Sequence, residues 1–136
     1  MKQGRVILAD SHPSMLAGIR RLLEDEVETV LMVADESSLY HALENFNPDV
    51  VVADLSLPIS KETNIAWLLK KKFPKIKVII LSTHDERLVV DDVMAAGIEG
   101  FVLKRRAVTD LIPAIREVLQ GKKYVSPDME GVSGVS

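Results

Sequence analysis

The chain has 136 residues, of which 47% are hydrophobic and 27% are charged, and it contains no cysteine. This composition is typical of one globular domain, and the lack of cysteine excludes disulfides, cysteine-ligated zinc sites and thiol nucleophiles. The formal net charge of -3 argues against direct nucleic-acid binding by this chain, because neutralising phosphates needs a clustered basic surface.

Short apolar runs and helical patterns alternate along the first half of the chain. The expected elements are a strand at 5–9, a helix from Pro13 to Leu23, a strand at 29–34 and a helix at 39–46. Both helices carry an apolar stripe with helical spacing. Pro13 suits a first helical position because its missing N–H has no partner there anyway. Ser37 or Ser38 is the expected N-cap of the second helix.

The same alternation continues through the second half. The expected elements are a strand at 50–53, a helix at 63–72, a strand at 76–81, a helix at 87–96, a strand at 100–103 and a helix at 111–119. The wholly apolar run at 50–53 predicts a strand that is covered on both faces. Gly97 and Gly121 suit the positions that follow helix ends. Five strands alternating with five helices predict a doubly wound α/β domain with a parallel sheet.

Three further features concern the surface and the location of the chain. Lys70, Lys71 and Lys72 end the third predicted helix and are interpreted as a solvated helix end. Residues 127–136 are small, polar and aperiodic, which predicts a linker stub or a disordered tail. No stretch approaches the ~20 apolar residues of a membrane span, and the N-terminus is too polar for a signal peptide. We therefore expect a cytoplasmic protein without membrane contact.

Polar residues end four of the five predicted strands. They are Asp10 with Ser11, Asp54, Ser82 and Lys104. Each residue alone would be interpreted as a loop, cap or edge residue. Because ligands of open parallel sheets bind beyond the carboxyl ends of the strands, we expect these side chains to converge there.

Two carboxylates at this edge need a counter-charge. Carboxylates a few ångströms apart repel each other by about 4 kcal/mol at an effective dielectric constant near 20. Mg²⁺ binds to one or two carboxylates together with other oxygen ligands, and a lysine with a serine hydroxyl can hold phosphoryl oxygens. The set therefore predicts phosphoryl transfer to a carboxylate, with Asp54 as the nucleophile.

Four motifs along the chain carry a family resemblance: ILADSHP, DLSLP, IILSTHD and GFVLK, in this order. Over about residues 4–126 the sequence resembles the receiver domain of bacterial two-component response regulators. The resemblance implies a CheY-like (flavodoxin-like) fold with a five-stranded parallel sheet of order 2-1-3-4-5. It also implies that residues 1–126 form the receiver domain.

The resemblance implies a role for each site residue. These are Asp54 as phosphoacceptor, Asp10 and the Ser56 backbone carbonyl as Mg²⁺ ligands, Ser82 as the switch hydroxyl, Lys104 as the phosphoryl-binding lysine, and Phe101 as the switch aromatic. In the family, that aromatic ring moves inward when the hydroxyl engages the phosphoryl group. The implied activity is that of a signalling phosphoacceptor rather than an enzyme.

The ADSHP, LSTHD and AIREVLQGKKYVSP segments resemble the NarL/FixJ (LuxR-type) branch in particular. Members of that branch usually carry a C-terminal helix-turn-helix domain, which this chain lacks. The linker-like tail leads us to expect a truncated protein rather than a single-domain member. The implied partners are a sensor histidine kinase, DNA only through the missing domain, and a second copy of the chain. The second copy would bind through the helix 4, strand 5 and helix 5 face or through another receiver face.

Ser11 departs from the family pattern, because a second acid that binds Mg²⁺ usually stands there. We therefore expect weak Mg²⁺ binding. The alternative is a degenerate receiver that signals by protein contact without phosphorylation. His12 and His84 flank the site and are interpreted as loop residues, since no third metal ligand is apparent. An aspartyl phosphatase is disfavoured because Ser56 stands where that class has its second acid.

Overall fold

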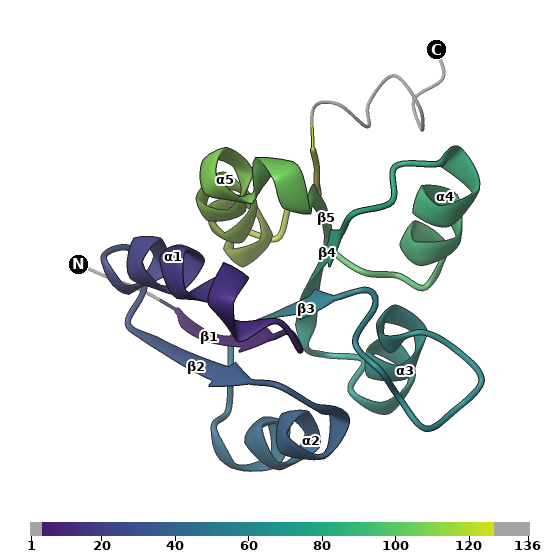
Figure 1. Cartoon of the computed structure of the whole chain (residues 1–136), viewed down its shortest axis with the longest axis horizontal. Helices are drawn as coiled ribbons and strands as arrows, with labels where there is room; N and C mark the ends of the chain where they lie inside the picture. The colour runs from purple at the N-terminus through teal and green to yellow at the C-terminus, as the bar shows by residue number, and fades with distance from the viewer. Residues whose placement is uncertain (1–3, 127–136) are drawn as a thin grey trace.

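The computed structural model describes residues 4–126, apart from the side chains of residues 13–16. This part of the chain forms one parallel sheet with helices on both faces (Figure 1). The strands are β1 (Arg5–Ala9), β2 (Thr29–Val33), β3 (Val50–Asp54), β4 (Lys77–Ser82), β5 (Gly100–Leu103) and β6 (Tyr124–Val125). The helices are α1 (Pro13–Glu24), α2 (Glu36–Asn45), α3 (Ile65–Lys72), α4 (Arg87–Ala95), the 3₁₀ helix η1 (Lys104–Arg106) and α5 (Ala107–Leu119).

The sheet has six strands in the order β2-β1-β3-β4-β5-β6, so the expectation of five strands was incomplete. The additional strand, β6, pairs in parallel with β5 through Gly100 with Tyr124 and Phe101 with Val125. Two residues are too few to show any strand periodicity in the sequence. Their extended conformation follows from pairing with β5, which is a tertiary contact.

The hydrophobic core lies in two layers, one on each face of the sheet. Along β3, Val50 and Val52 belong to the layer that contains α1 and α5, whereas Val51 and Ala53 belong to the layer that contains α2, α3 and α4. All four side chains are fully buried. A strand covered on both faces needs apolar side chains at every position, which explains the continuous apolar run.

Some helix starts differ from the predicted ones. The N-cap of α2 is Asp35, whose Oδ1 accepts a hydrogen bond from the Ser38 backbone N–H at 2.8 Å, so the expectation of a serine cap was wrong. The Asp35 carboxylate can accept the same hydrogen bond as a serine hydroxyl. Its negative charge is also favourable at the positive end of the helix. Helix α5 begins at Ala107, directly after η1, and therefore earlier than predicted. Gly97 and Gly121 have φ values of 94° and 86°, as expected after helix ends.

Lys70 is not part of a solvated helix end. Its Nζ lies 3.0 Å from Oε2 of Glu99 and donates to the carbonyl of Ile76 at 2.8 Å, and its side chain is only 11% exposed. Lys71 and Lys72 are exposed, as predicted. The helical spacing placed Lys70 correctly on α3, but its acidic partner, 29 positions later in the chain, is set by the fold.

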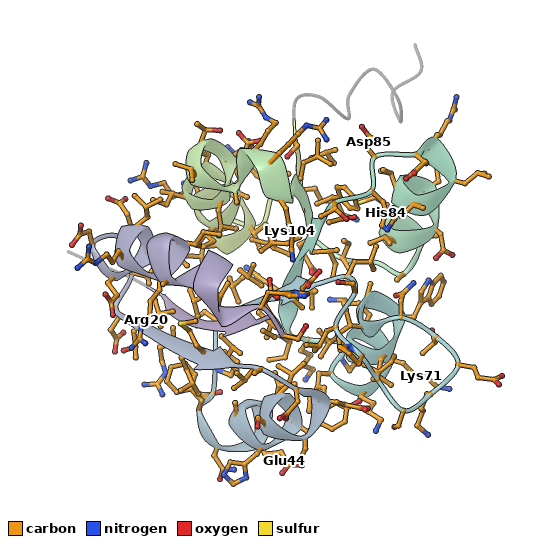
Figure 2. All side chains as sticks on the ribbon, in the orientation of Figure 1. Arg20, Glu44, Lys71, His84, Asp85 and Lys104 are labelled. Atoms are coloured by element: carbon orange, nitrogen blue, oxygen red, sulfur yellow. The ribbon has the colours of Figure 1, made fainter. Side chains whose placement is uncertain are left out.

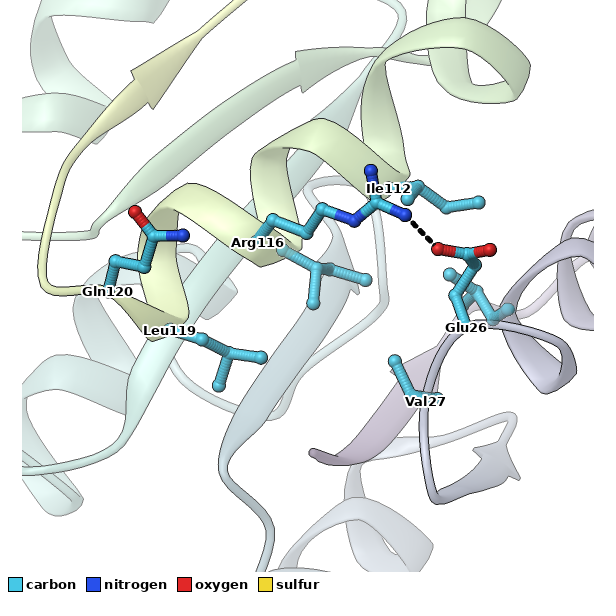
Figure 3. A pocket seen from close by; sticks show the side chains of 8 residues that line it. Glu26, Val27, Ile112, Arg116, Leu119 and Gln120 are labelled. Carbon is cyan, nitrogen blue, oxygen red and sulfur yellow. Dashed lines mark hydrogen bonds and ion pairs between the residues drawn. The ribbon is translucent and has the colours of Figure 1, made fainter. Parts of the chain in front are cut away.

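A groove of about 300 Å³ lies between α1 and α5, on the other side of the molecule from α3 (Figures 1 and 3). Arg116 of α5 forms an ion pair with Glu26 across this groove, and Ile112, Leu119 and Val27 line it (Figure 3).

Within residues 4–126, no helix has the length and apolar character needed to cross a bilayer. The predicted linker at 127–136 lies outside the described residues.

Candidate functional site: an acidic pair and a lysine at the carboxyl edge of the sheet

Asp10 and Asp54 stand at the carboxyl ends of the adjacent strands β1 and β3. The chain leaves β1 for β2 on one side and later returns to β3 on the other, so the strand order reverses between these two carboxylates. Doubly wound sheets bind ligands at this point. Asp10 and Asp54 are 1% and 2% exposed, which is unusual for carboxylates without strong partners.

Lys104 brings a positive charge to this pair. It follows β5 as the first residue of η1, and Figure 2 shows it near the centre of the view, whereas Arg20, Glu44 and Lys71 lie at the periphery. Its Nζ lies 2.9 Å from Oδ2 of Asp54 and 3.1 Å from Oδ2 of Asp10. One ammonium group therefore bridges both carboxylates.

The electrostatics of the site keep Asp54 and Lys104 charged. Burial alone would raise the pKa of Asp54, but hydrogen bonds from Lys104 and from the Ser56 backbone outweigh it and hold this pKa below its usual value of 3.8. Burial would lower the pKa of Lys104, whereas its contacts with Asp54 and Asp10 raise it above 10.5. Asp54 is therefore an ionised carboxylate near neutral pH, the form that a nucleophile requires.

Ser56 contacts Asp54 through its amide and its hydroxyl. The backbone N–H donates to Oδ1 of Asp54 at 3.1 Å, and Oγ lies 3.0 Å from each carboxylate oxygen. The family resemblance implies a metal-binding role for the carbonyl of Ser56, whereas the hydroxyl contact was not predicted from the sequence. A serine two residues after a strand-end aspartate can form this local turn, but its rotamer is not readable from the sequence.

Ser82 and Phe101 lie on the neighbouring strands. Oγ of Ser82 accepts a hydrogen bond from the His84 backbone N–H at 2.9 Å and donates to the His84 carbonyl at 3.2 Å. The Ser82 hydroxyl is therefore engaged with its own loop rather than with Asp54. Phe101 is fully buried in the core layer of α2, α3 and α4. In this structure the Phe101 ring is buried while the Ser82 hydroxyl is bound to its own loop.

The ring of His12 points towards the two carboxylates, which the sequence did not predict. It lies in the loop after β1, as predicted, but its Nδ1 is 3.3 Å from Oδ1 of Asp10 and 3.9 Å from Oδ2 of Asp54. Its backbone N–H also donates to Oδ1 of Asp10 at 2.8 Å. Ser11, between Asp10 and His12, is half-buried. The only sequence signal for His12 was its place two residues after the strand-end acid.

The residues present fit a divalent cation. The ligand atoms of Asp10, His12 and Asp54 all lie within 4.8 Å of one another. Oδ2 of Asp10 is buried and accepts no well-aligned hydrogen bond from the described residues, although the Lys104 ammonium is close by. Buried polar atoms normally have a partner, so an oxygen of this kind is a ligand position for a cation. Mg²⁺ takes one or two carboxylates of this kind, with waters and phosphate oxygens completing its coordination.

A doubly wound α/β fold with an acidic pair and a lysine at its switch point defines the class: the CheY-like, flavodoxin-like domains. Residues 6–116 match the response regulator receiver domain family. The chain therefore belongs to the response regulator receiver domains, which are signalling domains and generally not enzymes.

Individual relatives are of the NarL/LuxR type. The chain is 35% identical over 130 residues to the transcriptional regulatory protein RcsB of Escherichia coli (strain K12). This match covers 91% of this chain and 60% of RcsB. It is 31% identical over 125 residues to the transcriptional regulatory protein DegU of Brevibacillus brevis, covering 90% of this chain and 53% of DegU. The chain thus spans only 53% to 60% of the length of these relatives.

A solved structure of similar extent is the isolated REC domain of RcsB from Salmonella enterica serovar Typhimurium, in the presence of the phosphomimetic BeF₃⁻. It matches this chain with a TM-score of 0.86 at 32% sequence identity, and the match covers 96% of this chain and 99% of that one. The likeness therefore extends over the whole of that isolated domain.

Proposed function

We propose that Asp54 accepts a phosphoryl group from the phosphohistidine of a sensor histidine kinase. The observation that carries this proposal is the Lys104 ammonium, which lies 2.9 Å from Asp54 and 3.1 Å from Asp10 at the sheet edge, where all three side chains are at most 7% exposed. Burying two carboxylates and one ammonium group lowers the stability of a fold, because each desolvated charge costs several kcal/mol. Their presence is therefore best explained by function.

The transfer follows from the charges of these three side chains. An oxygen of the ionised Asp54 forms a bond to phosphorus while the phosphorus–nitrogen bond of the donor breaks. The donor imidazole keeps the electron pair and takes a proton from solvent. Lys104 is placed to neutralise charge on the phosphoryl oxygens. A Mg²⁺ ion held by Asp10, Asp54 and the Ser56 carbonyl would neutralise the remaining charge, and Ser11 would make its binding weak.

Phosphorylation would then change the hydrogen bonding of Ser82. To reach a phosphoryl group on Asp54, its hydroxyl must leave the two His84 backbone groups that it now contacts. We propose that this loop change and the position of Phe101 together switch the face formed by α4, β5 and α5. Leu88 of α4 and Val108 of α5 are exposed apolar side chains, at 84% and 68%, and they support a contact of these two helices with a second copy of the chain.

The output proposed for the whole protein is transcriptional regulation through a separate DNA-binding domain. One similar solved structure is an RcsB–DNA complex, at 31% identity and a TM-score of 0.87, and this chain covers 68% of that chain. We propose residues 1–126 as the receiver domain and residues 127–136 as the linker to that further domain.

The test is phosphorylation by a small acyl or amido phosphodonor over a wide Mg²⁺ range, followed by intact mass spectrometry. We expect one phosphoryl adduct on the wild-type chain and none on Asp54→Asn. The Lys104→Met variant should bind the metal but form the adduct at least about 10²-fold more slowly, because it lacks the group that neutralises phosphoryl charge. An adduct of equal yield on Asp54→Asn, or none on the wild type at any Mg²⁺ concentration, would refute the proposal.

A second candidate function is a degenerate receiver that signals by protein contact alone. Ser11 favours it, because a hydroxyl replaces the carboxylate that binds the metal in the family. The two candidates differ in three measurements: a degenerate receiver shows neither a saturable Mg²⁺ titration nor a phosphoryl adduct, and it keeps its partner affinity in Asp54→Asn.

A further inference from the structure

A groove of about 450 Å³ lies against α3, and Trp67, Leu68 and Ala96 form its apolar part. Lys61, in the loop before α3, and Lys71, in the last turn of the helix, also line it. Trp67 is 39% exposed, although tryptophan is highly buried on average. Because tryptophan often carries much of the affinity of a protein interface, an exposed one in a groove indicates a binding surface.

Two lysines in this groove are available to an anionic partner. Lys70 is held by Glu99 and by backbone carbonyls, whereas Lys61 and Lys71 are exposed and form no ion pair within the described part of the chain. Lys71 lies one turn after Trp67 on α3, so the two side chains share one side of the helix. Figure 2 shows Lys71 at the outer edge of the molecule. None of the residues that line the groove is acidic.

The charge of the chain is divided unevenly around this groove. Residues 61–77 contain six lysines and one glutamate, a formal charge of +5, in a chain whose net charge is -3. The rest of the chain therefore carries -8. The dipole of α3 accounts for a lysine in its last turn, such as Lys71, but not for Lys61, which precedes the helix. A local positive field on an otherwise negative molecule attracts and orients a partner of opposite charge.

We propose that this groove binds an acidic peptide segment of a partner protein. An apolar side chain of the segment packs on the Trp67 ring, and its carboxylates lie beside Lys61 and Lys71. A single-stranded nucleic acid fits less well, because it stacks on several aromatic rings and would continue over a negative surface. No arginine, the side chain that holds phosphate in a bidentate manner, lines the groove.

The test uses a short peptide of aspartates and glutamates around one leucine, added to the wild-type chain without a phosphodonor. Trp67 is the only tryptophan in the sequence, so its emission reports on this groove directly. We expect a saturable blue shift, because the leucine displaces water from the ring, and weaker binding at high salt. Replacing the leucine by glycine, or the carboxylates by amides, should weaken binding at least about ten-fold.

The anisotropy of the same peptide, carrying a fluorescent label, compares variants of the chain. We expect Trp67→Ala, and the double variant Lys61→Glu with Lys71→Glu, each to lower the affinity at least about ten-fold. Lys122→Glu with Lys123→Glu is the matched control, because these exposed lysines lie outside the groove and the change in net charge is the same. It should lower the affinity less than about two-fold, since the added charges are distant and screened.

Three results would overturn the proposal. They are no saturable shift up to about 1 mM peptide, equal losses of affinity in the two double variants, and tighter binding of a single-stranded oligothymidylate or of anionic lipid vesicles. Because Lys61 and Lys71 are exposed, their replacement keeps the fold, and the double variant decides the outcome even if Trp67→Ala fails to fold. Circular dichroism checks each variant. None of these results depends on phosphorylation, so failure here leaves the proposed function of Asp54 unaffected.

Discussion

At the scale of single residues, the Lys104 ammonium contacts both Asp10 and Asp54, and Ser11 and His12 lie in the loop beside them. Lys104 is 7% exposed at its side chain, so solvent screens its contacts with the two carboxylates only weakly. The sequence predicted that these three charges would meet, because each ends a parallel strand. It did not reveal that the His12 ring turns towards them.

We expect Ser11→Asp to raise the Mg²⁺ affinity at least about ten-fold, because it restores a carboxylate beside Asp10. Isothermal titration calorimetry of the wild type and the variant measures this directly. Ser37→Asp, a change at an exposed serine on α2, is the charge-matched control and should leave the Mg²⁺ affinity unaltered. Equal affinity in all three proteins would show that Ser11 does not limit Mg²⁺ binding.

Asp110 predicts a pH dependence of stability away from the site. Burial would raise its pKa, but contacts with Arg106, Ser126 and Thr109 lower it below 3.8. Since the folded pKa lies below the unfolded one, the charged group stabilises the fold above pH 3.8, and this contribution disappears as the pH falls through the folded pKa.

We therefore expect the free energy of unfolding of the wild type to fall more steeply below pH 3.8 than that of Asp110→Asn. Urea unfolding at several pH values between neutrality and the acid range measures the difference. If the two proteins keep a constant difference in stability across this range, the charge of Asp110 does not contribute in the way described.

At the scale of the elements, Ser126, the residue after the short strand β6, connects the end of that strand to α5 and β5. The Ser126 hydroxyl donates to Oδ2 of Asp110 on α5 at 2.9 Å and accepts from the Leu103 backbone N–H on β5 at 3.0 Å. The Ser126 backbone N–H donates to the Phe101 carbonyl at 2.9 Å. Ser126 is thus hydrogen-bonded to β5, the strand that carries Phe101, the proposed switch aromatic. It directly precedes the proposed linker.

We expect Ser126→Ala to lower the free energy of unfolding by about 1–3 kcal/mol, because it leaves the buried Leu103 N–H without its acceptor. Hydrogen exchange of the Leu103 and Ser126 amides should become faster in the variant. Ser37→Ala removes an exposed hydroxyl from α2 and serves as the control. A change in Ser126→Ala no larger than in the control would mean that this contact does not hold β6 in place.

At the scale of the whole molecule, stability comes from the two apolar layers that enclose the sheet. Ile80 of β4 is fully buried in the layer of α2, α3 and α4, whereas Leu88 of α4 is 84% exposed. The two residues have nearly the same size and lie close in sequence, but they differ in burial. They therefore form a matched pair for testing whether the core or the α4 surface stabilises the fold.

We expect Ile80→Ala to cost about 2–5 kcal/mol of unfolding free energy and Leu88→Ala about 0.5 kcal/mol or less. Chemical denaturation of both variants gives the two values. The Leu88→Ala variant should instead weaken any self-association through the exposed surface of α4, as followed by sedimentation. A large loss of stability in Leu88→Ala would show that this side chain packs within the domain.

The sequence alone determined the alternation of strands and helices, the parallel sheet, and the meeting of Asp10, Asp54 and Lys104 at its carboxyl edge. Apolar periodicity reports which faces are buried, and right-handed crossovers then leave few possible topologies. These properties depend on neighbours in sequence and on general rules of chain connection.

Only the tertiary structure decided the pairing of β6 with β5, the ion pair of Lys70 with Glu99 and the direction of the His12 ring. The first two depend on residues that are more than twenty positions apart and leave no periodic signal. The third depends on a side-chain rotamer in a loop, which is set by the charges around it. Local patterns determine where the chain is buried, whereas contacts between distant segments determine how the polar side chains meet.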